Sequence, residues 1–164
     1  MANNAAYDLQ AVAKDRQALE RLISIMKYQD PEYFIYRVFS VEHEPIEEHE
    51  DGYFSVLIFG DVAWGTSSWF DGNENEEWKA HANDAHYITL DLLAPRLGIA
   101  VECYCEEEGC EFQSHHLCSH NGLVRERYAD WHRGDDDDGE DDDGGLEDYG
   151  TWHKPSEIWE GVVI

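Results

Sequence analysis

Apolar and polar positions recur with fixed periods over much of the chain, and these periods predict its strands and helices. Residues 7–13 alternate as expected for a short strand. Asp15 follows as a suitable N-cap for a helix. The spacing i, i+3, i+4, i+7 of an amphipathic helix is then met by the apolar residues Leu19, Leu22, Ile23 and Met26.

Two runs rich in β-branched and aromatic residues come next, at residues 33–41 and 53–64. The acidic segment between them contains the turn signal Asp51-Gly52, so we expect the runs to pair as a long antiparallel hairpin. Residues 64–82 mix tryptophans with turn residues and acids. We expect an ordered loop there, because large aromatic side chains are costly to leave in water.

A second helix is predicted between Asn83, which can cap it, and Gly98, which can end it. Pro95 weakens its last turn. The residues expected to face inward are Ala85, Ile88, Leu92 and Leu93.

Further strands are expected at residues 99–105, 110–119 and 123–128. Asn121-Gly122 lies between the last two and is a strong signal for a two-residue hairpin turn. The chain then passes through an acidic tract to a C-terminal segment rich in tryptophan and aliphatic residues, which we expect to dock on the core.

The order strand, helix, strand, strand, helix, strand predicts an α+β fold of the ferredoxin-like, split βαβ type. We expect an antiparallel sheet with two helices on one face and an extra C-terminal hairpin. The predicted organisation is a domain at residues 1–132, an acidic loop or disordered tract at 133–149, and a docking segment at 150–164.

The sequence WGTSSW at 64–69, the acidic loop after it, a helix ending LAPRLGIAVECYCEEEGCEF and the Asn-Gly hairpin resemble the YubB-type ferredoxin-like domain of plasmid and phage proteins. The likeness covers residues 7–128 as architecture, with its motifs in 64–122. The family's loop reads closer to Trp-Gly-Thr-Lys-Trp, whereas Ser67-Ser68 stand between Thr66 and Trp69 here. The resemblance implies a fold and a mobile-element origin, and it transfers no active site.

Charge changes the picture most. The 164 residues include 37 acids and 11 Lys or Arg, a net charge of -26, yet residues 1–37 carry five of each and are neutral. Such a field repels phosphate groups, so we expect no direct nucleic-acid or anionic-membrane binding. No stretch reaches the roughly 18 apolar residues of a membrane span, and the first residues lack a signal-peptide pattern. We therefore expect a cytoplasmic location in a host cell.

The acids fall into four groups, which we expect to converge on one strip that imitates a polyanion. The groups are Glu42, Glu44, Glu47, Glu48, Glu50 and Asp51; Asp71, Glu74, Glu76 and Glu77; Glu106, Glu107 and Glu108; and Asp135, Asp136, Asp137, Asp138, Glu140, Asp141, Asp142 and Asp143.

Proteins that bind DNA do so through channels lined with Lys and Arg, and a fold covered with carboxylates can occupy such a channel. With the mobile-element resemblance, this favours a non-enzymatic inhibitor that binds a basic nucleic-acid-binding protein of the host by DNA mimicry, as an anti-CRISPR or anti-restriction protein. Trp64, Trp69 and Trp78 are candidate apolar anchors. The alternatives are an accessory protein-binding module without mimicry and a small zinc-binding protein.

The zinc alternative depends on Cys103, Cys105, Cys110 and Cys118. Their spacing begins C-x-C, which differs from the paired C-x2-C knuckles of structural zinc sites. Free cysteines are also common core residues, and in the cytosol we expect all four to be reduced. No catalytic motif is present, and the acidic tract fails the EF-hand pattern in both possible registers. We therefore expect no catalytic residues, no cofactor and no bound metal.

Overall fold

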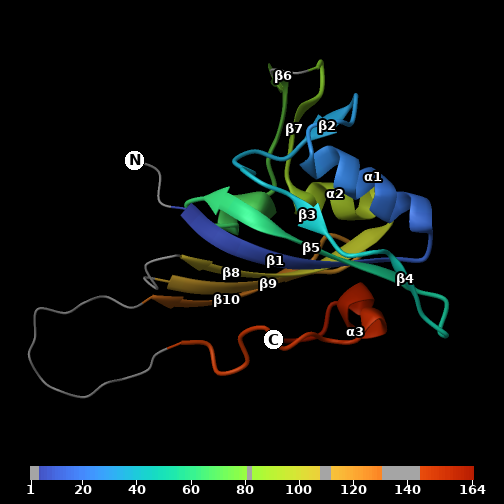
Figure 1. Cartoon of the computed structure of the whole chain (residues 1–164), viewed down its shortest axis with the longest axis vertical. Coiled ribbons are helices and arrows are strands. Elements are labelled where there is room, and N and C mark those ends of the chain that lie inside the picture. Colours follow the sequence, from blue (N-terminus) through green and yellow to red (C-terminus); the bar gives the residue numbers. More distant parts are fainter. Residues whose placement is uncertain (1–3, 81–82, 108–111, 131–144) are drawn as a thin grey trace, which may run out of the picture.

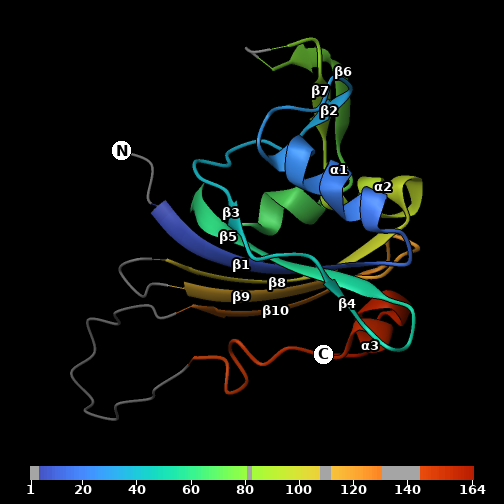
Figure 2. The same cartoon turned by 45° about the vertical axis from the view of Figure 1, so that its right-hand side comes forward.

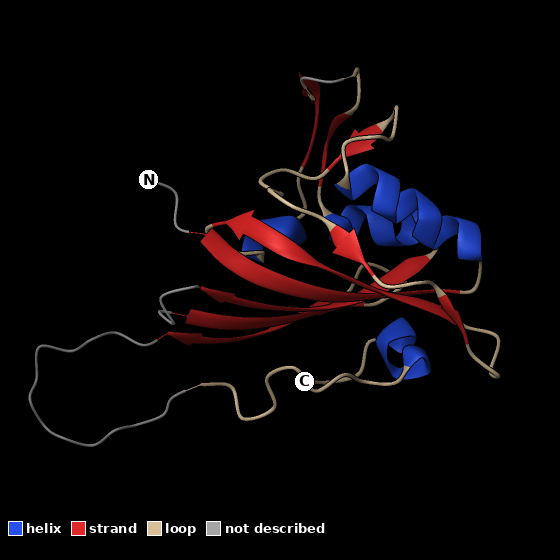
Figure 3. Cartoon of the chain, viewed as in Figure 1, coloured by secondary structure: helices blue, strands red, loops and turns tan. Residues whose placement is uncertain are grey.

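The computed structural model describes residues 4–80, 83–107, 112–130 and 145–164 (Figure 1). It is a mixed α+β chain with a mostly antiparallel sheet and three short α-helices (Figure 3). The helices are α1 (Arg16–Met26), α2 (Leu90–Leu97) and α3 (Pro155–Glu160), with a short 3-10 helix η1 (Ser67–Phe70). The strands are β1 (Asn4–Ala13), β2 (Tyr33–Phe34), β3 (Glu42–His43), β4 (Glu47–Glu48), β5 (Phe54–Ala63), β6 (Glu74–Lys79), β7 (His86–Ile88), β8 (Ile99–Glu107), β9 (Phe112–Cys118) and β10 (Val124–Asp130).

The main sheet has the strand order β10-β9-β8-β1-β5-β3, and β4 also pairs with β5. All its pairs are antiparallel. A small sheet of order β2-β7-β6 stands apart from it, and its β2–β7 pair is parallel. The chain is therefore richer in strands than the sequence pattern predicted.

Helix α1 forms where the sequence predicted it. The Asp15 side chain accepts a hydrogen bond from the Gln17 backbone N–H at 2.9 Å, as an N-cap does. Its apolar face, including Leu19, Leu22 and Met26, is fully buried. These side chains share one core cluster with α2, η1 and the facing side of the sheet.

The prediction that residues 33–41 and 53–64 pair as a long hairpin is wrong for the first of the two runs. The second run forms β5, but only Tyr33–Phe34 of the first run is a strand, and it belongs to the small sheet. Arg37 has a φ of 66°, in the left-handed region that bulky residues rarely adopt. Arg37 interrupts the extended run. Beyond it, the chain pairs with β5 through the isolated bridge Val38–Val62.

The second helix begins later than predicted. Asn83 caps no helix, because its side chain donates to the Asp30 carbonyl at 3.0 Å and accepts from the Ala85 N–H at 3.0 Å. The following residues form β7, and α2 starts after Thr89. Its end is as predicted, with Gly98 in the left-handed region at φ 72°.

The C-terminal segment covers the side of the sheet opposite α1 (Figure 2). Its helix α3 contacts β1, β8 and β9. There Ile158 and Trp159 pack on Val12 and Ala100, which form a second, smaller core cluster. The longest described helix has 11 residues, and none in the described part of the chain could span a bilayer, which takes about 20 apolar residues.

Candidate binding edge

The chain from residue 36 to residue 51 follows the outer edge of β5. Backbone hydrogen bonds join Phe39 to Asp61 and Glu44 to Leu57, each at 2.9 Å. The strands β3 and β4 pair with β5 farther along the same edge. The contact is close because Gly60 lacks a side chain, since a Cβ there would overlap the backbone carbonyl of Ser40.

The first acidic group lies on this segment, and we call it the acidic edge. All six of its carboxylate residues are exposed, namely Glu42, Glu44, Glu47, Glu48, Glu50 and Asp51. No lysine or arginine occurs between Arg37 and Lys79 in the sequence. The acidic edge is therefore a strip of negative charge with no lysine or arginine within it.

The spacing of these charges can be compared with DNA. The residues from Glu42 to Glu48 lie opposite β5 residues Phe59 to Phe54, a span of about 17 Å at the usual strand rise of about 3.4 Å. The four carboxylates between these ends are thus spaced at about 6 Å on average. One strand of B-DNA presents one phosphate per about 3.4 Å of helix axis, so the strip is less densely charged than DNA by less than a factor of two.

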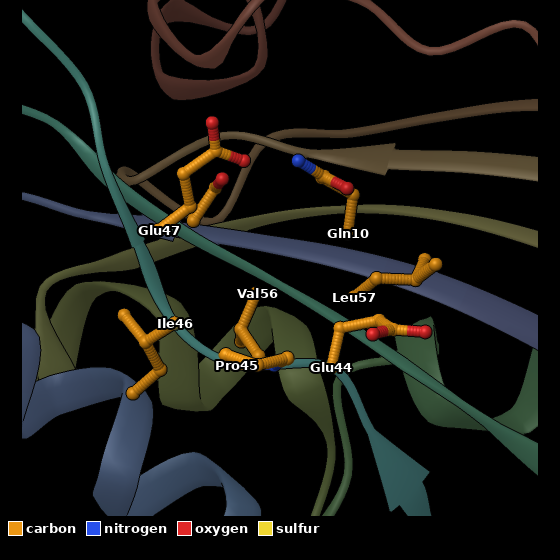
Figure 4. Close-up of a pocket in the computed structure, with 8 residues that line it drawn as sticks. Gln10, Glu44, Pro45, Ile46, Glu47, Val56 and Leu57 are labelled. Carbon is orange, nitrogen blue, oxygen red and sulfur yellow. The ribbon is translucent and has the colours of Figure 1, made fainter.

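A pocket of about 490 Å³ opens on the acidic edge. Its lining combines two carboxylates and an amide with aliphatic carbon, and Figure 4 shows the side chains of Glu44, Glu47 and Gln10 around it. The other lining residues are Pro45, Ile46, Ser55, Val56 and Leu57. A hollow with anionic walls and an aliphatic floor fits a long basic side chain, whose methylenes need apolar contact and whose head needs carboxylates.

An exposed aromatic row lies near the start of this segment. The Arg37 guanidinium lies over the rings of Trp64 and Tyr36, at 4.8 and 5.2 Å from their centroids. Tyr36 in turn contacts Trp78 with ring centroids 4.5 Å apart. Tyr36, Trp64 and Trp78 are 39%, 57% and 40% exposed. Trp64, like Arg37, has a positive φ, and such backbone strain is frequent at binding sites.

Trp69 does not belong to this row. It is 1% exposed, its Nε1–H donates to the Tyr36 carbonyl at 2.9 Å, and its ring meets that of Tyr7 edge to face. Of the three predicted tryptophan anchors, the structure therefore places two at the surface and one in the core.

Three members of the second acidic group, Glu74, Glu76 and Glu77, lie on β6 of the small sheet, away from the acidic edge (Figure 1). Asp71 directly follows η1. All four side chains are exposed. Glu74 is already paired, because Arg96 donates to both of its carboxylate oxygens at 2.9 and 2.7 Å and His86 contacts it at 2.9 Å. The Arg96 and His86 hydrogen bonds lower the pKa of Glu74 to about 2.

The third and fourth groups do not extend the strip within the described residues. Glu106 is partly buried and Glu107 is buried at the end of β8. Glu108 and the tract Asp135–Asp143 lie outside the described residues, as does Cys110. The structure thus gathers the first group into one strip and places the second and third elsewhere.

Three of the four candidate zinc cysteines are core residues. Cys103, Cys105 and Cys118 are free, fully buried and part of the main core cluster. Burial raises the pKa of Cys105 and of Cys118 to about 12 and that of Cys103 well above its usual value. Since zinc binds the thiolate, protonated thiols in an apolar core are poor ligands.

A different group of potential metal ligands was missed by sequence reasoning. Glu102, His115 and His153 offer donor atoms that all lie within 4.8 Å of one another. The one sequence signal was Glu102 itself, an acid within the otherwise apolar and cysteine-rich strand IAVECYC. His115 and His153 could not be linked to it without knowing how the C-terminal segment docks.

No family model, curated protein or solved structure matches this chain.

Proposed function

We propose that this protein is a non-enzymatic inhibitor that uses the acidic edge to bind the basic nucleic-acid site of a host defence complex. The observation that carries the proposal is the row of exposed carboxylates on the acidic edge, whose mean spacing is within a factor of two of that of phosphates along one DNA strand. A row of arginines and lysines arranged to bind a DNA backbone would meet several carboxylates along it. The class of target is therefore a DNA-binding effector, such as a CRISPR effector or a restriction enzyme.

The pocket and the aromatic row extend this proposal. One arginine or lysine of the partner enters the pocket between Glu44 and Glu47, where the carboxylates bind its charged head. The exposed aromatic rings of Trp64 and Tyr36 then supply apolar contact area at one end of the strip. Charge alone attracts the partner at long range, whereas the pocket and the aromatic row fix its position along the acidic edge.

We further propose that the fold contains a ferredoxin-like core. This interpretation takes the strand order β8-β1-β5-β3, with α1 after β1 and α2 before β8, as the order of that core. In this interpretation β9 and β10 are additions at one edge, and the small sheet is an insertion. A core of this type is what the resemblance to the YubB-type domain implies.

A second candidate function is an accessory protein-binding module without mimicry. The aromatic row favours it, because exposed aromatic residues grouped around an arginine are a typical centre for a protein interface, and here Arg37 lies over both Tyr36 and Trp64 while Tyr36 contacts Trp78. Such an interface would be centred on Trp64 and Tyr36 and would depend weakly on salt.

The experiment compares two variants with the same change in net charge. The edge variant replaces Glu42, Glu44, Glu47 and Glu48 by Gln, and the tract variant replaces Asp135, Asp136, Asp137 and Asp138 by Asn. Affinities for purified CRISPR effectors and restriction endonucleases are measured at several salt concentrations, with and without competing DNA.

Four surface ion pairs at about 0.5 kcal/mol each predict a loss of roughly 30-fold for the edge variant. The tract variant should bind almost as wild type, and DNA should compete with both. Equal losses of affinity in the two variants would mean that the net charge of the protein, and not the position of its carboxylates, determines binding. Binding that ignores salt, DNA and the edge variant would favour the accessory module.

A further inference from the structure

Glu102, His115 and His153 come together beneath the C-terminal segment, far from the acidic edge. Glu102 lies on β8 and His115 on β9, and His153 precedes α3. Glu102 shares its face of the sheet with Ala100, which packs against α3, because alternate strand residues face the same side. Three segments distant in sequence thus contribute one side chain each.

The spacing of the donor atoms suits a small divalent cation. The Nε2 atom of His115 lies 3.3 Å and the Nδ1 atom of His153 lies 3.1 Å from the same carboxylate oxygen, Oε1 of Glu102. Ligand atoms at about 2.0–2.2 Å from a tetrahedral zinc ion are about 3.3–3.6 Å apart. The first contact already has this spacing, and the second needs to open by only a few tenths of an ångström.

Two groups of the cluster are incompletely satisfied. The Glu102 side chain is fully buried; it accepts from the backbone N–H of His153 at 3.4 Å and contacts the ring Nδ1 of His153 at 2.8 Å, but among the described residues its ion-pair partners are two histidines, which carry a charge only when protonated. The Nε2 atom of His115 is also buried and has no hydrogen-bond partner within the described part of the chain. A buried carboxylate without a cation and a buried unpaired nitrogen are both costly. A divalent ion between them would satisfy both groups.

We propose that Glu102, His115 and His153 bind one divalent transition-metal ion, of which zinc best fits two imidazoles and a carboxylate. The ion ties the C-terminal segment to β8 and β9. His153 is 29% exposed at its side chain, which leaves a path for the ion and for a water molecule as the fourth ligand. The ring of Tyr104 stacks on His115 at 4.2 Å and 11°, and this contact holds the imidazole plane in place.

Arg127 contacts His115 and should affect metal binding at this site. Its Nη2 atom lies 2.9 Å from Nδ1 of His115. A guanidinium can only donate, so without metal Nδ1 accepts and the imidazole proton is on Nε2, facing Glu102. Metal binding at Nε2 moves that proton to Nδ1, and Arg127 must then turn away toward Asp148, which its Nη1 already approaches at 3.6 Å. Arg127 therefore weakens metal binding, and Gln at this position should strengthen it.

The test uses the full chain freed of metal with a chelator. Zinc is titrated in competition with a chromophoric chelator, and cobalt is titrated while visible absorption is recorded. The variants are His153→Gln, Glu102→Gln and Arg127→Gln, and the matched control is His43→Gln, which removes an exposed histidine on the acidic edge. Circular dichroism checks that each variant is folded.

We expect one tightly bound zinc per chain, unchanged in His43→Gln. Losing His153 or Glu102 should weaken binding by more than the about 10–100-fold that loss of an outer-shell partner costs, and Arg127→Gln should tighten binding several-fold. The cobalt complex should show d–d bands without a thiolate charge-transfer band.

A thiolate band would move the metal to the cysteines and overturn the proposal, as would wild-type affinity in His153→Gln or binding no tighter than that of other acidic surfaces. If His153→Gln and Glu102→Gln fail to fold, Arg127→Gln still decides, because unchanged or weaker binding contradicts the assigned geometry. None of these results depends on the inhibitor proposal.

Discussion

Glutamates in different parts of one sheet have opposite environments in this molecule. On the acidic edge, Glu42 and Glu44 are exposed, and no lysine or arginine occurs in that stretch of the sequence. Three strands away from β3, on β8, Glu102 is fully buried between His115 and His153. A carboxylate in water costs nothing to keep charged, whereas a buried carboxylate needs a cation supplied by the fold.

The difference assigns different roles to the two regions. The carboxylates of the acidic edge lie in solvent, where a partner can reach them. Glu102 instead contacts histidines from two other segments, which makes the cluster suitable for holding the C-terminal segment in place. Charged edge strands also prevent sheets of two copies from pairing, and a charge of either sign serves that purpose. Mimicry of DNA, in contrast, requires that the charge be negative.

The largest expected effect is a difference in the free energy of unfolding between variants of two tryptophans that are five residues apart. Trp69→Ala removes a fully buried ring that packs on Tyr7, and it should lower the free energy of unfolding by about 3–5 kcal/mol. Trp64→Ala removes a ring that is 57% exposed, and it should cost less than about 1 kcal/mol. Urea denaturation of both variants measures the difference. Equal costs would mean that the core is not where the structure places it.

Gly60→Ala tests how the acidic edge is attached to the sheet. An added Cβ would overlap the Ser40 carbonyl and push the edge segment away from β5. We expect a loss of about 1–3 kcal/mol in unfolding free energy, as for other overpacked sites. Affinity for the effector should fall as well, because the carboxylates lose their register. Wild-type stability and affinity would show that the edge segment is not held in this position.

Lowering the pH should disturb the protein interior, through the buried His116, more than the acidic edge. Burial lowers the pKa of His116 from 6.5 to about 4, so between these values the unfolded chain binds a proton that the native protein does not. The free energy of unfolding therefore falls as pH drops through this window, by up to about 1.4 kcal/mol per pH unit from this residue.

Denaturation across this pH range should show a shallower dependence in His116→Phe than in wild type. His43→Gln, which removes an exposed histidine, serves as the control. If His116→Phe keeps the wild-type slope, His116 is not buried in its neutral form.

The smallest effect on stability is expected on the acidic edge itself. Glu44 is exposed, and no ion pair is recorded for it in the described part of the chain, so Glu44→Gln should change the free energy of unfolding by less than about 0.5 kcal/mol. The same variant should still weaken effector binding measurably, because Glu44 lines the pocket. Thermal denaturation and a binding titration on one sample test both statements. A stability change larger than the binding change would make Glu44 a structural residue.

Local signals in the sequence were sufficient for several elements. The Asp15 cap and the apolar spacing predicted α1, the Asn121-Gly122 pair predicted the β9–β10 hairpin, and Gly98 predicted the end of α2. These features depend on residues close together in the chain. Hydrophobic periodicity and turn chemistry therefore suffice to specify them.

Features that depend on tertiary contacts were not predictable in the same way. The left-handed Arg37 splits the run 33–41 between two sheets, although its sequence is typical of one strand. Asn83 has the chemistry of a helix cap but bonds to the distant Asp30 carbonyl instead. At the site, the sequence identified the six acids of the acidic edge but not that they line one edge of β5. It also could not bring His153 to Glu102.

The salt dependence of effector binding tests the central claim most directly. Wild type, the edge variant and a variant with Glu42, Glu44, Glu47 and Glu48 replaced by Lys are titrated against the same DNA-binding effector over a range of salt concentrations. If the acidic edge replaces DNA phosphates, the slope of log affinity against log salt should be shallower in the edge variant than in wild type, because charged contacts have been removed. The Lys variant should not bind at all. Equal slopes and affinities in all three proteins would contradict the account.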